Sequence, residues 1–127
     1  MNESQLIIVL MLLFIVKHFV VDFPLQRPYH YLNKGTYGHP GGLAHAGLQG
    51  AGTFVVLVFF TSLPWAVLMA AFDTVVHYHI DWAKMRLNKH FGWAPTSNEQ
   101  FWWLLGFDQL THYVTYVMII AWTVGVL

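Results

Sequence analysis

Long apolar stretches alternate with short polar segments along this sequence. Three of these stretches contain no Asp, Glu, Lys or Arg, and they cover residues 4–16, 46–72 and 109–127. A helix that crosses a lipid bilayer needs about 20 mostly apolar residues. With the apolar residues that flank each stretch, the pattern predicts four membrane-spanning helices, at about residues 5–23, 43–62, 64–84 and 101–126.

Prolines and short turns set the expected ends of these helices. Pro24 disfavours a helical conformation at the residue before it, so the first helix is expected to end there. Pro64 suits the first turn of the third helix, which only a tight turn separates from the second. The predicted fold is all-α, an integral membrane four-helix bundle made of two helical hairpins, with residues 1–127 as a single transmembrane domain.

Composition favours a membrane protein. The chain is 57% hydrophobic and 9% charged, whereas a typical soluble domain is about 25% charged. The formal net charge is zero, so nucleic acid is not an expected partner, and membrane lipid is. The absence of cysteine excludes disulfides, thiolate metal sites and cysteine nucleophiles.

The basic residues predict the orientation of the spans. All six Lys and Arg residues fall on the side of the two long loops, residues 24–42 and 85–100. Positive residues near the ends of spans mark the cytoplasmic side of a membrane. Both termini are therefore expected on the non-cytoplasmic side of a multi-pass protein.

Histidine and aspartate recur at helical spacing within the predicted spans. Residues four apart share one face of a helix, and three such pairs are present: His18 with Asp22, His77 with Asp81, and Asp108 with His112. His45, near the start of the second helix, adds a seventh residue. Because successive helices run in opposite directions, all seven side chains are expected at one depth, close to the cytoplasmic face.

These seven residues are candidate metal ligands. An ionisable side chain in lipid costs several kcal/mol, so it faces the bundle interior and pairs or binds something. Imidazole with carboxylate is a ligand set of Zn²⁺, Fe²⁺ and Mn²⁺, and we expect a divalent metal, zinc before iron or manganese. Seven candidates suit two metals, or one metal whose histidines are oriented by the remaining carboxylates. A proton relay and a purely structural hydrogen-bond network are the alternatives.

Other polar residues lie near the predicted cluster. Lys84 shares a face with His77 and either binds an anionic group or extends to the lipid headgroups. Asp73 lies one turn deeper and either orients His77 or accepts a proton. Lys17 is on a different face from His18 and is expected to reach the headgroups or pair with an acid. The loop histidines expected to face solvent are His30, His39 and His90.

The spacing of these residues resembles a known family. The motifs are His18-x3-Asp22-Phe23-x-Leu25-Gln26, His45, His77-x3-Asp81-x2-Lys84 and Phe107-Asp108-Gln109-x2-His112. They resemble an uncharacterised family of small bacterial and phage membrane proteins, classed as a domain of unknown function, over about residues 12–115. The resemblance implies a compact helical domain in the inner membrane of a bacterium. A looser similarity connects the chain to membrane-bound proteins classed as metal-dependent hydrolases.

The preferred function is a metal-dependent hydrolase at the cytoplasmic interface. Asp22, Asp81 and Asp108 would act as ligands or bases, and Lys84 would hold an anionic group of a lipid or phosphate-containing substrate. The N-termini of the second and fourth helices point to the same region and favour an anion. The absence of HExxH and G-x-S-x-G motifs excludes the commonest zinc-protease and serine-hydrolase signatures.

Other functions stay open at this point. An ion, proton or metal transporter uses the same intramembrane residues, and bis-histidine haem binding and a noncatalytic membrane interaction protein are further alternatives. Four short helices give limited shielding to a buried cluster, which leaves a homo-oligomer open.

Overall fold

The computed structural model describes residues 1–127 as four long helices and one short helix. The helices are α1 (Glu3–Asp22), α2 (Pro28–Tyr31), α3 (Pro40–Leu57), α4 (Leu63–Phe91) and α5 (Glu99–Val124). The all-α prediction is confirmed, and each of the four expected helices has a counterpart. The pattern of apolar residues does not predict α2, a single turn that begins at a proline in the first long loop.

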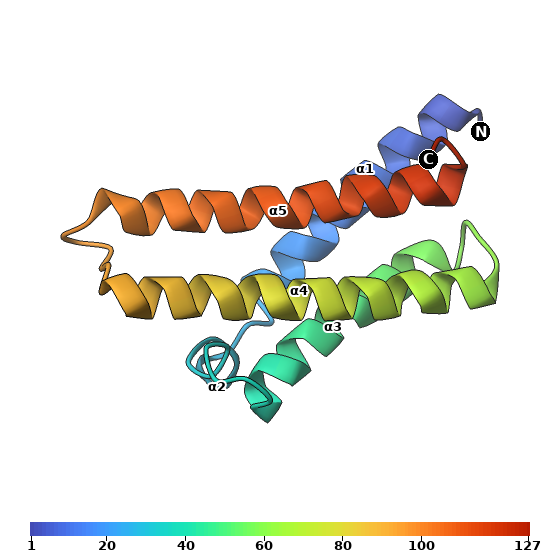
Figure 1. Ribbon diagram of the computed structural model, residues 1–127. Helices are drawn as coiled ribbons and strands as arrows, with labels where there is room; N and C mark the ends of the chain where they lie inside the picture. Colours follow the sequence, from blue (N-terminus) through green and yellow to red (C-terminus); the bar gives the residue numbers. More distant parts are fainter.

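The long helices form a ring in which each one packs against two neighbours. Both α1 and α4 contact α3 and α5, while α2 rests on α3. Figure 1 shows the two termini at the same end of the molecule as the α3–α4 turn, whereas α2 and the α4–α5 loop lie toward the other end. This arrangement is that of two hairpins, and its orientation relative to a membrane stays a prediction.

Three helix boundaries differ from the expected ones by three or more residues. Helix α3 ends at Leu57 rather than at residue 62, and local signals explain the other two differences. Helix α3 begins at Pro40 rather than at residue 43, since proline suits the first turn and His39 Nδ1 accepts a hydrogen bond from the Gly41 amide at 3.0 Å. Helix α4 continues to Phe91 rather than ending at residue 84. Polar residues follow Lys84, but nothing interrupts the helix until Gly92 adopts a left-handed φ of 65°.

Glycines of α3 let the neighbouring helices approach closely. A Cβ atom on Gly50 would overlap the Thr74 hydroxyl and lie 2.8 Å from the Ala70 carbonyl oxygen of α4. A Cβ atom on Gly52 would lie 2.6 Å from Cγ of Lys17 in α1. By contrast, a Cβ atom on Gly47 would have no neighbour within 4 Å. Gly50 and Gly52 are therefore required by the packing of α3 against α4 and α1.

We expect Gly50→Ala to lower stability, because overpacking at a close contact costs about 1–3 kcal/mol. Gly47→Ala on the same helix is the matched control, since it meets no neighbour and gains helix propensity worth up to about 1 kcal/mol. The midpoint of thermal unfolding in detergent measures both effects. An equal shift in the two variants would contradict close packing at Gly50.

The apolar core occupies the end of the bundle that carries the termini. It consists of Leu10, Phe14, Leu57, Ala66, Met69, Tyr116, Ile119 and Ile120. These residues come from the middle of α1, the last turn of α3, the first turns of α4 and the second half of α5. The interior toward the opposite end of the bundle is polar.

The expectation of four membrane spans is not supported by helix length and apolarity. Only α1 is long and apolar enough to cross a membrane by these criteria. A helix near the N-terminus that meets them can also be a signal sequence or a core helix. The buried polar residues of the other long helices, such as Gln49 in α3 and Asp73 in α4, reduce their apolar character.

Candidate metal centre

The structure brings the seven predicted ligand residues together inside the bundle. They come from all four long helices, and every one of their side chains is buried. The members are His18 and Asp22 of α1, His45 of α3, His77 and Asp81 of α4, and Asp108 and His112 of α5. The helices alternate in direction, so residues late in α1, early in α3, in the middle of α4 and in the first half of α5 reach one level.

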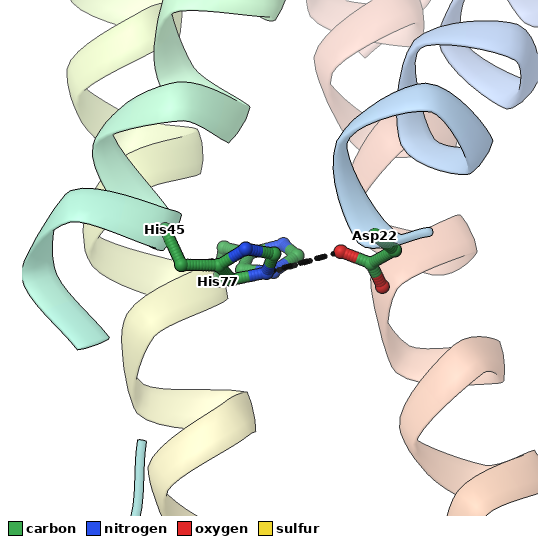
Figure 2. Close-up of side chains that lie close together, drawn as sticks. All are labelled: Asp22, His45 and His77. Atoms are coloured by element: carbon green, nitrogen blue, oxygen red, sulfur yellow. Dashed lines mark hydrogen bonds and ion pairs between the residues drawn. The ribbon is translucent and has the colours of Figure 1, made fainter. Parts of the chain in front are cut away.

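A first group of possible ligands joins α1, α3 and α4. His45 Nε2 lies 3.1 Å from Asp22 Oδ1, and His77 Nε2 lies 3.7 Å from the same oxygen. The two Nε2 atoms of His45 and His77 are 3.3 Å apart. Figure 2 shows the two imidazoles side by side, facing the carboxylate that extends from the end of α1.

A second group joins α4 and α5 and shares His77 with the first. Asp81 Oδ2 is 3.2 Å from His77 Nε2, and Asp81 Oδ1 is 3.3 Å from His112 Nε2. The rings of His77 and His112 stack, with centroids 3.9 Å apart and planes inclined by 20°. Both groups are contacted by the same nitrogen of His77, Nε2, and one nitrogen lone pair binds one metal ion. The two groups therefore cannot both use His77 as a ligand at the same time.

The remaining two candidates extend the cluster at its edges. His18 Nε2 lies 3.2 Å from Asp22 Oδ2, and Asp108 Oδ1 lies 3.5 Å from His112 Nε2. Neither residue belongs to the two compact groups. Their positions suit roles in orienting the central residues.

Three central atoms have separations close to those of ligands of one metal ion. Metal–nitrogen and metal–oxygen bonds of about 2.0–2.1 Å place tetrahedral ligands about 3.3 Å apart. Asp22 Oδ1, His45 Nε2 and His77 Nε2 are separated by 3.1, 3.3 and 3.7 Å, and Asp81 Oδ2 lies 3.4 Å from His45 Nε2 and 3.2 Å from His77 Nε2. Asp22, His45 and His77 could therefore hold one divalent metal, with Asp81 beside the two histidines.

The close approach of His45 and His77 also favours a shared cation. Two N–H groups 3.3 Å apart would repel one another, so at least one of these Nε2 atoms presents a lone pair. A metal ion satisfies both lone pairs at once. The opposite ring nitrogens, Nδ1 of His45 and of His77, are buried without a hydrogen-bond partner, so the contacts of both rings are made through Nε2.

Three lysines neutralise most of the negative charge around the cluster. Lys17 Nζ is 2.8 Å from Asp73 Oδ2, Lys34 Nζ is 2.8 Å from Asp81 Oδ2, and Lys84 Nζ is 3.5 Å from Asp108 Oδ2. With Asp22, four carboxylates face three ammonium groups, which leaves one negative charge when the histidines are neutral. A buried charge needs a partner. Either a bound cation or a protonated His112, whose Nε2 atom lies 3.3 Å from Asp81 Oδ1 and 3.5 Å from Asp108 Oδ1, would supply it.

A hydrogen-bonded chain holds Asp22 in place from behind. Lys17 Nζ donates to Asp73 Oδ2 and, at 2.9 Å, to Gln49 Oε1, whose amide nitrogen donates to Asp22 Oδ1 at 2.6 Å. Thr53 donates to Asp73 Oδ2 at 2.5 Å. Asp73 therefore pairs with Lys17 rather than orienting His77, which was one of the two roles that the sequence suggested for it. Lys17 is buried and pairs with Asp73, so its side chain does not extend to the lipid headgroups.

Helix α5 orients His18. The Nδ1 atom of His18 forms a hydrogen bond of 2.7 Å with the Tyr116 hydroxyl, and its Nε2 atom lies 2.9 Å from Gln109 Oε1. The Gln109 amide nitrogen donates to Asp108 Oδ2 at 3.1 Å. Contacts of this kind fix the ring orientation of histidines in metal sites.

Sequence reasoning missed Lys34 and Tyr116 as members of the site. Lys34 sits in the first long loop, where no periodicity indicates the direction of a side chain, yet it is 95% buried against Asp81. Tyr116 lies one turn beyond His112 on α5, and this spacing of four is the signal that could have found it.

The loop histidines do not all face solvent as expected. His90 is exposed, whereas His39 caps α3 and is partly buried. The ring of His30 lies 6.1 Å from that of His45. Partial burial, together with the nearby His45, Lys34 and Arg27, lowers the pKa of His30.

The fold and the site define a class of all-α protein with a buried His/Asp cluster that could hold a metal ion. The chain belongs to the family described as "Protein of unknown function (DUF3307)", whose model matches residues 9–126. This match covers the whole cluster and most of the chain, in agreement with the resemblance noted from the motifs. No curated protein and no solved structure matches the chain.

Proposed function

We propose that this chain is a membrane protein that binds one divalent metal, zinc before iron or manganese, and uses it to hydrolyse a phosphate-containing or lipid substrate at the cytoplasmic face. The observation that carries the proposal is the set of separations of 3.1, 3.3 and 3.7 Å among ligand atoms of Asp22, His45 and His77, which could hold a metal ion. Asp22 has lone pairs enough to bind a metal while its Oδ1 atom accepts a hydrogen bond from Gln49.

Each residue of the cluster has a role in this proposal. Asp22, His45 and His77 would hold the metal, because a catalytic zinc commonly has three protein ligands and an open fourth position. The metal would supply Lewis acidity and lower the pKa of a water molecule. Asp81 lies beside His45 and His77 and is held independently by His112 and Lys34, which suits a base that takes a proton from this water. Asp108 and Lys84 would position His112 and an anionic group.

The membrane part of the proposal rests on apolar surface. In this proposal the four long helices cross the inner membrane of a bacterium, α1 being the one apolar enough to do so by itself, and both termini lie on the non-cytoplasmic side. Large apolar side chains on the outside of the bundle support this placement. They include Ile8, Leu12 and Val16 of α1 and Val114 and Val117 of α5.

Transport is less well supported as a function. The polar interior reaches as far as Asp73 and Thr53, and beyond them lie the apolar side chains of Leu10, Phe14 and Leu57. A pathway for ions needs polar groups or water along its whole length. The polar cluster is therefore more consistent with a closed site at one end of the bundle.

Elemental analysis of the purified protein tests the metal centre. We expect about one zinc, iron or manganese per chain after extraction in a mild detergent, and a higher unfolding midpoint with the metal than after treatment with a chelator. Absence of stoichiometric metal, with reconstitution by zinc, iron and manganese also failing, would overturn the proposal in favour of a purely structural polar network.

A further inference from the structure

A cavity of about 200 Å³ lies on the loop side of the metal cluster, against the α4–α5 hairpin. Residues of the first long loop form one wall, and the facing turns of α4 and α5 form the others. Its size is below the roughly 300–1,000 Å³ of sites for drug-sized ligands. The space therefore suits a small molecule or the headgroup of a larger one.

Two lysines connect this cavity to the cluster. Lys34 and Lys84 both line the cavity, and their Nζ atoms lie 2.8 Å from Asp81 Oδ2 and 3.5 Å from Asp108 Oδ2. Neither ammonium makes any other polar contact in the structure, whereas Lys17 donates to two acceptors and lies 4.3 Å from the centre of the Tyr116 ring. Lys34 and Lys84 therefore keep N–H donors for an anion in the cavity.

Two amide oxygens in the wall need a different partner. Gln26 Oε1 and Asn88 Oδ1 both line the cavity and are buried without a hydrogen-bond donor. The orientation of Gln26 is set, because its amide nitrogen donates to the Asp22 carbonyl oxygen at 2.6 Å. A fully deprotonated phosphate has no donor to offer these oxygens, but a hydroxyl or ammonium group has.

The rest of the wall is apolar. Met85, Phe101, Leu104 and Leu105 complete most of it. Such a surface accommodates the carbon atoms of a ligand and limits the number of polar groups that it can carry. The lining thus combines two cationic donors, two neutral acceptors and a hydrocarbon surface within one small space.

From this combination we infer that the cavity binds a small phosphate ester whose alcohol part carries hydroxyl or ammonium groups, as in glycerol phosphate or phosphoethanolamine. The inference rests on the proposed function, because it names the substrate class of that site. The phosphate contacts the free N–H groups of Lys34 and Lys84, next to the carboxylates of the cluster. The hydroxyl or ammonium groups donate to Gln26 Oε1 and Asn88 Oδ1. The ligand is a free phosphate ester or the headgroup of a phospholipid.

Calorimetric titration of the detergent-solubilised protein tests the inference. The probes are glycerol 3-phosphate, phosphoethanolamine and inorganic phosphate in solution, and phosphatidylglycerol in mixed micelles. We expect at least one of the esters or the phospholipid to bind. At alkaline pH inorganic phosphate is a dianion with a single hydroxyl, so it leaves at least one amide oxygen unpaired and should bind about tenfold more weakly. Binding by the soluble esters alone indicates a free substrate, and binding by phosphatidylglycerol indicates a lipid headgroup.

Three variants locate the binding site. Asn88→Leu keeps the approximate volume and removes the acceptor, and we expect roughly tenfold weaker binding of the ester with no change for inorganic phosphate. Lys84→Met is expected to weaken binding of both. Lys89→Met, which replaces an exposed lysine of the same helix, is the control and should bind as the wild type does. Circular dichroism verifies that each variant is folded.

The outcomes separate this inference from the proposed function. The lysines and the amide oxygens belong to the chain, so ester binding is expected to persist in protein stripped of metal. If the protein holds metal but no ester or phospholipid binds, or if Asn88→Leu and Lys84→Met bind as tightly as Lys89→Met, the cavity assignment is wrong. If the ester binds and no metal does, the proposed hydrolase is wrong and the binding site remains.

Discussion

Replacing His77 with alanine is expected to remove essentially all bound metal. His77 is the residue common to both compact groups, and its Nε2 atom lies within 3.7 Å of Asp22, His45 and Asp81 ligand atoms. Loss of a residue that only orients a ligand reduces metal affinity about 10- to 100-fold. Loss of a direct ligand is expected to cost more, so metal content should fall to background after dialysis.

The matched control for this prediction is His79→Ala. His79 lies two residues further along α4, is exposed, and bonds the Tyr37 hydroxyl at 3.0 Å rather than any member of the cluster. Elemental analysis of the two variants beside the wild type measures the effect. If both variants keep the metal content of the wild type, the metal is bound elsewhere. If both lose metal to the same extent, the metal is bound adventitiously by surface histidines.

Lys17→Met is expected to be the most destabilising single substitution among the lysines. It leaves Asp73, which is fully buried, without its cation and with Thr53 as the remaining donor. Breaking a buried ion pair by removing one partner costs about 3–5 kcal/mol, while replacing both partners together is often close to neutral. The double variant Lys17→Met/Asp73→Asn should therefore recover much of the lost stability.

Denaturant or thermal unfolding in detergent measures this cycle. The coupling between the two substitutions is expected to reach about 0.5–3 kcal/mol, the range for residues in direct contact. Lys89→Met is again a suitable control, because Lys89 is exposed and contacts no acid. If the single and double variants are equally destabilised, Lys17 acts through the packing of its stem rather than through its charge.

The sequence pattern was sufficient for the helices but not for all of their ends. Apolar stretches and prolines identify four long helices, and the glycine at position 92 is the signal for the true end of α4. Polar residues between Lys84 and Gly92 suggested a loop because the helix was expected to leave the membrane there. A helix with a solvated surface tolerates such residues, so polarity alone does not end it.

The i, i+4 spacing correctly indicated which side chains share a face of one helix. It cannot indicate which neighbour each face meets, and Lys17 and His18 illustrate the difference. Helix α1 packs against both α3 and α5. The two adjacent residues therefore point to different partners, Lys17 to Gln49 of α3 and His18 to Gln109 of α5. Only the three-dimensional arrangement shows that both are buried.

The contribution of Lys34 in the first long loop was not predictable, whereas Gln26, which follows Pro24, could be expected to return toward the site. Lys34 reaches Asp81 from a segment with no helical periodicity, and Gln26 is fixed by a backbone carbonyl at the end of α1. Such contacts depend on how a loop folds back over the bundle. The cavity beside the cluster arises from the same folding, since both residues line it.

The absence of a side chain at Gly52 limits which residues positions 17 and 52 can hold together. The hydrocarbon stem of Lys17 crosses α3 at this point, and a Cβ atom there would lie 2.6 Å from Lys17 Cγ. A methyl group at position 52 would displace the stem and, with it, the ammonium that supports both Gln49 and Asp73. Positions 17 and 52 are therefore coupled. A lysine at position 17 that keeps these hydrogen bonds requires glycine at position 52.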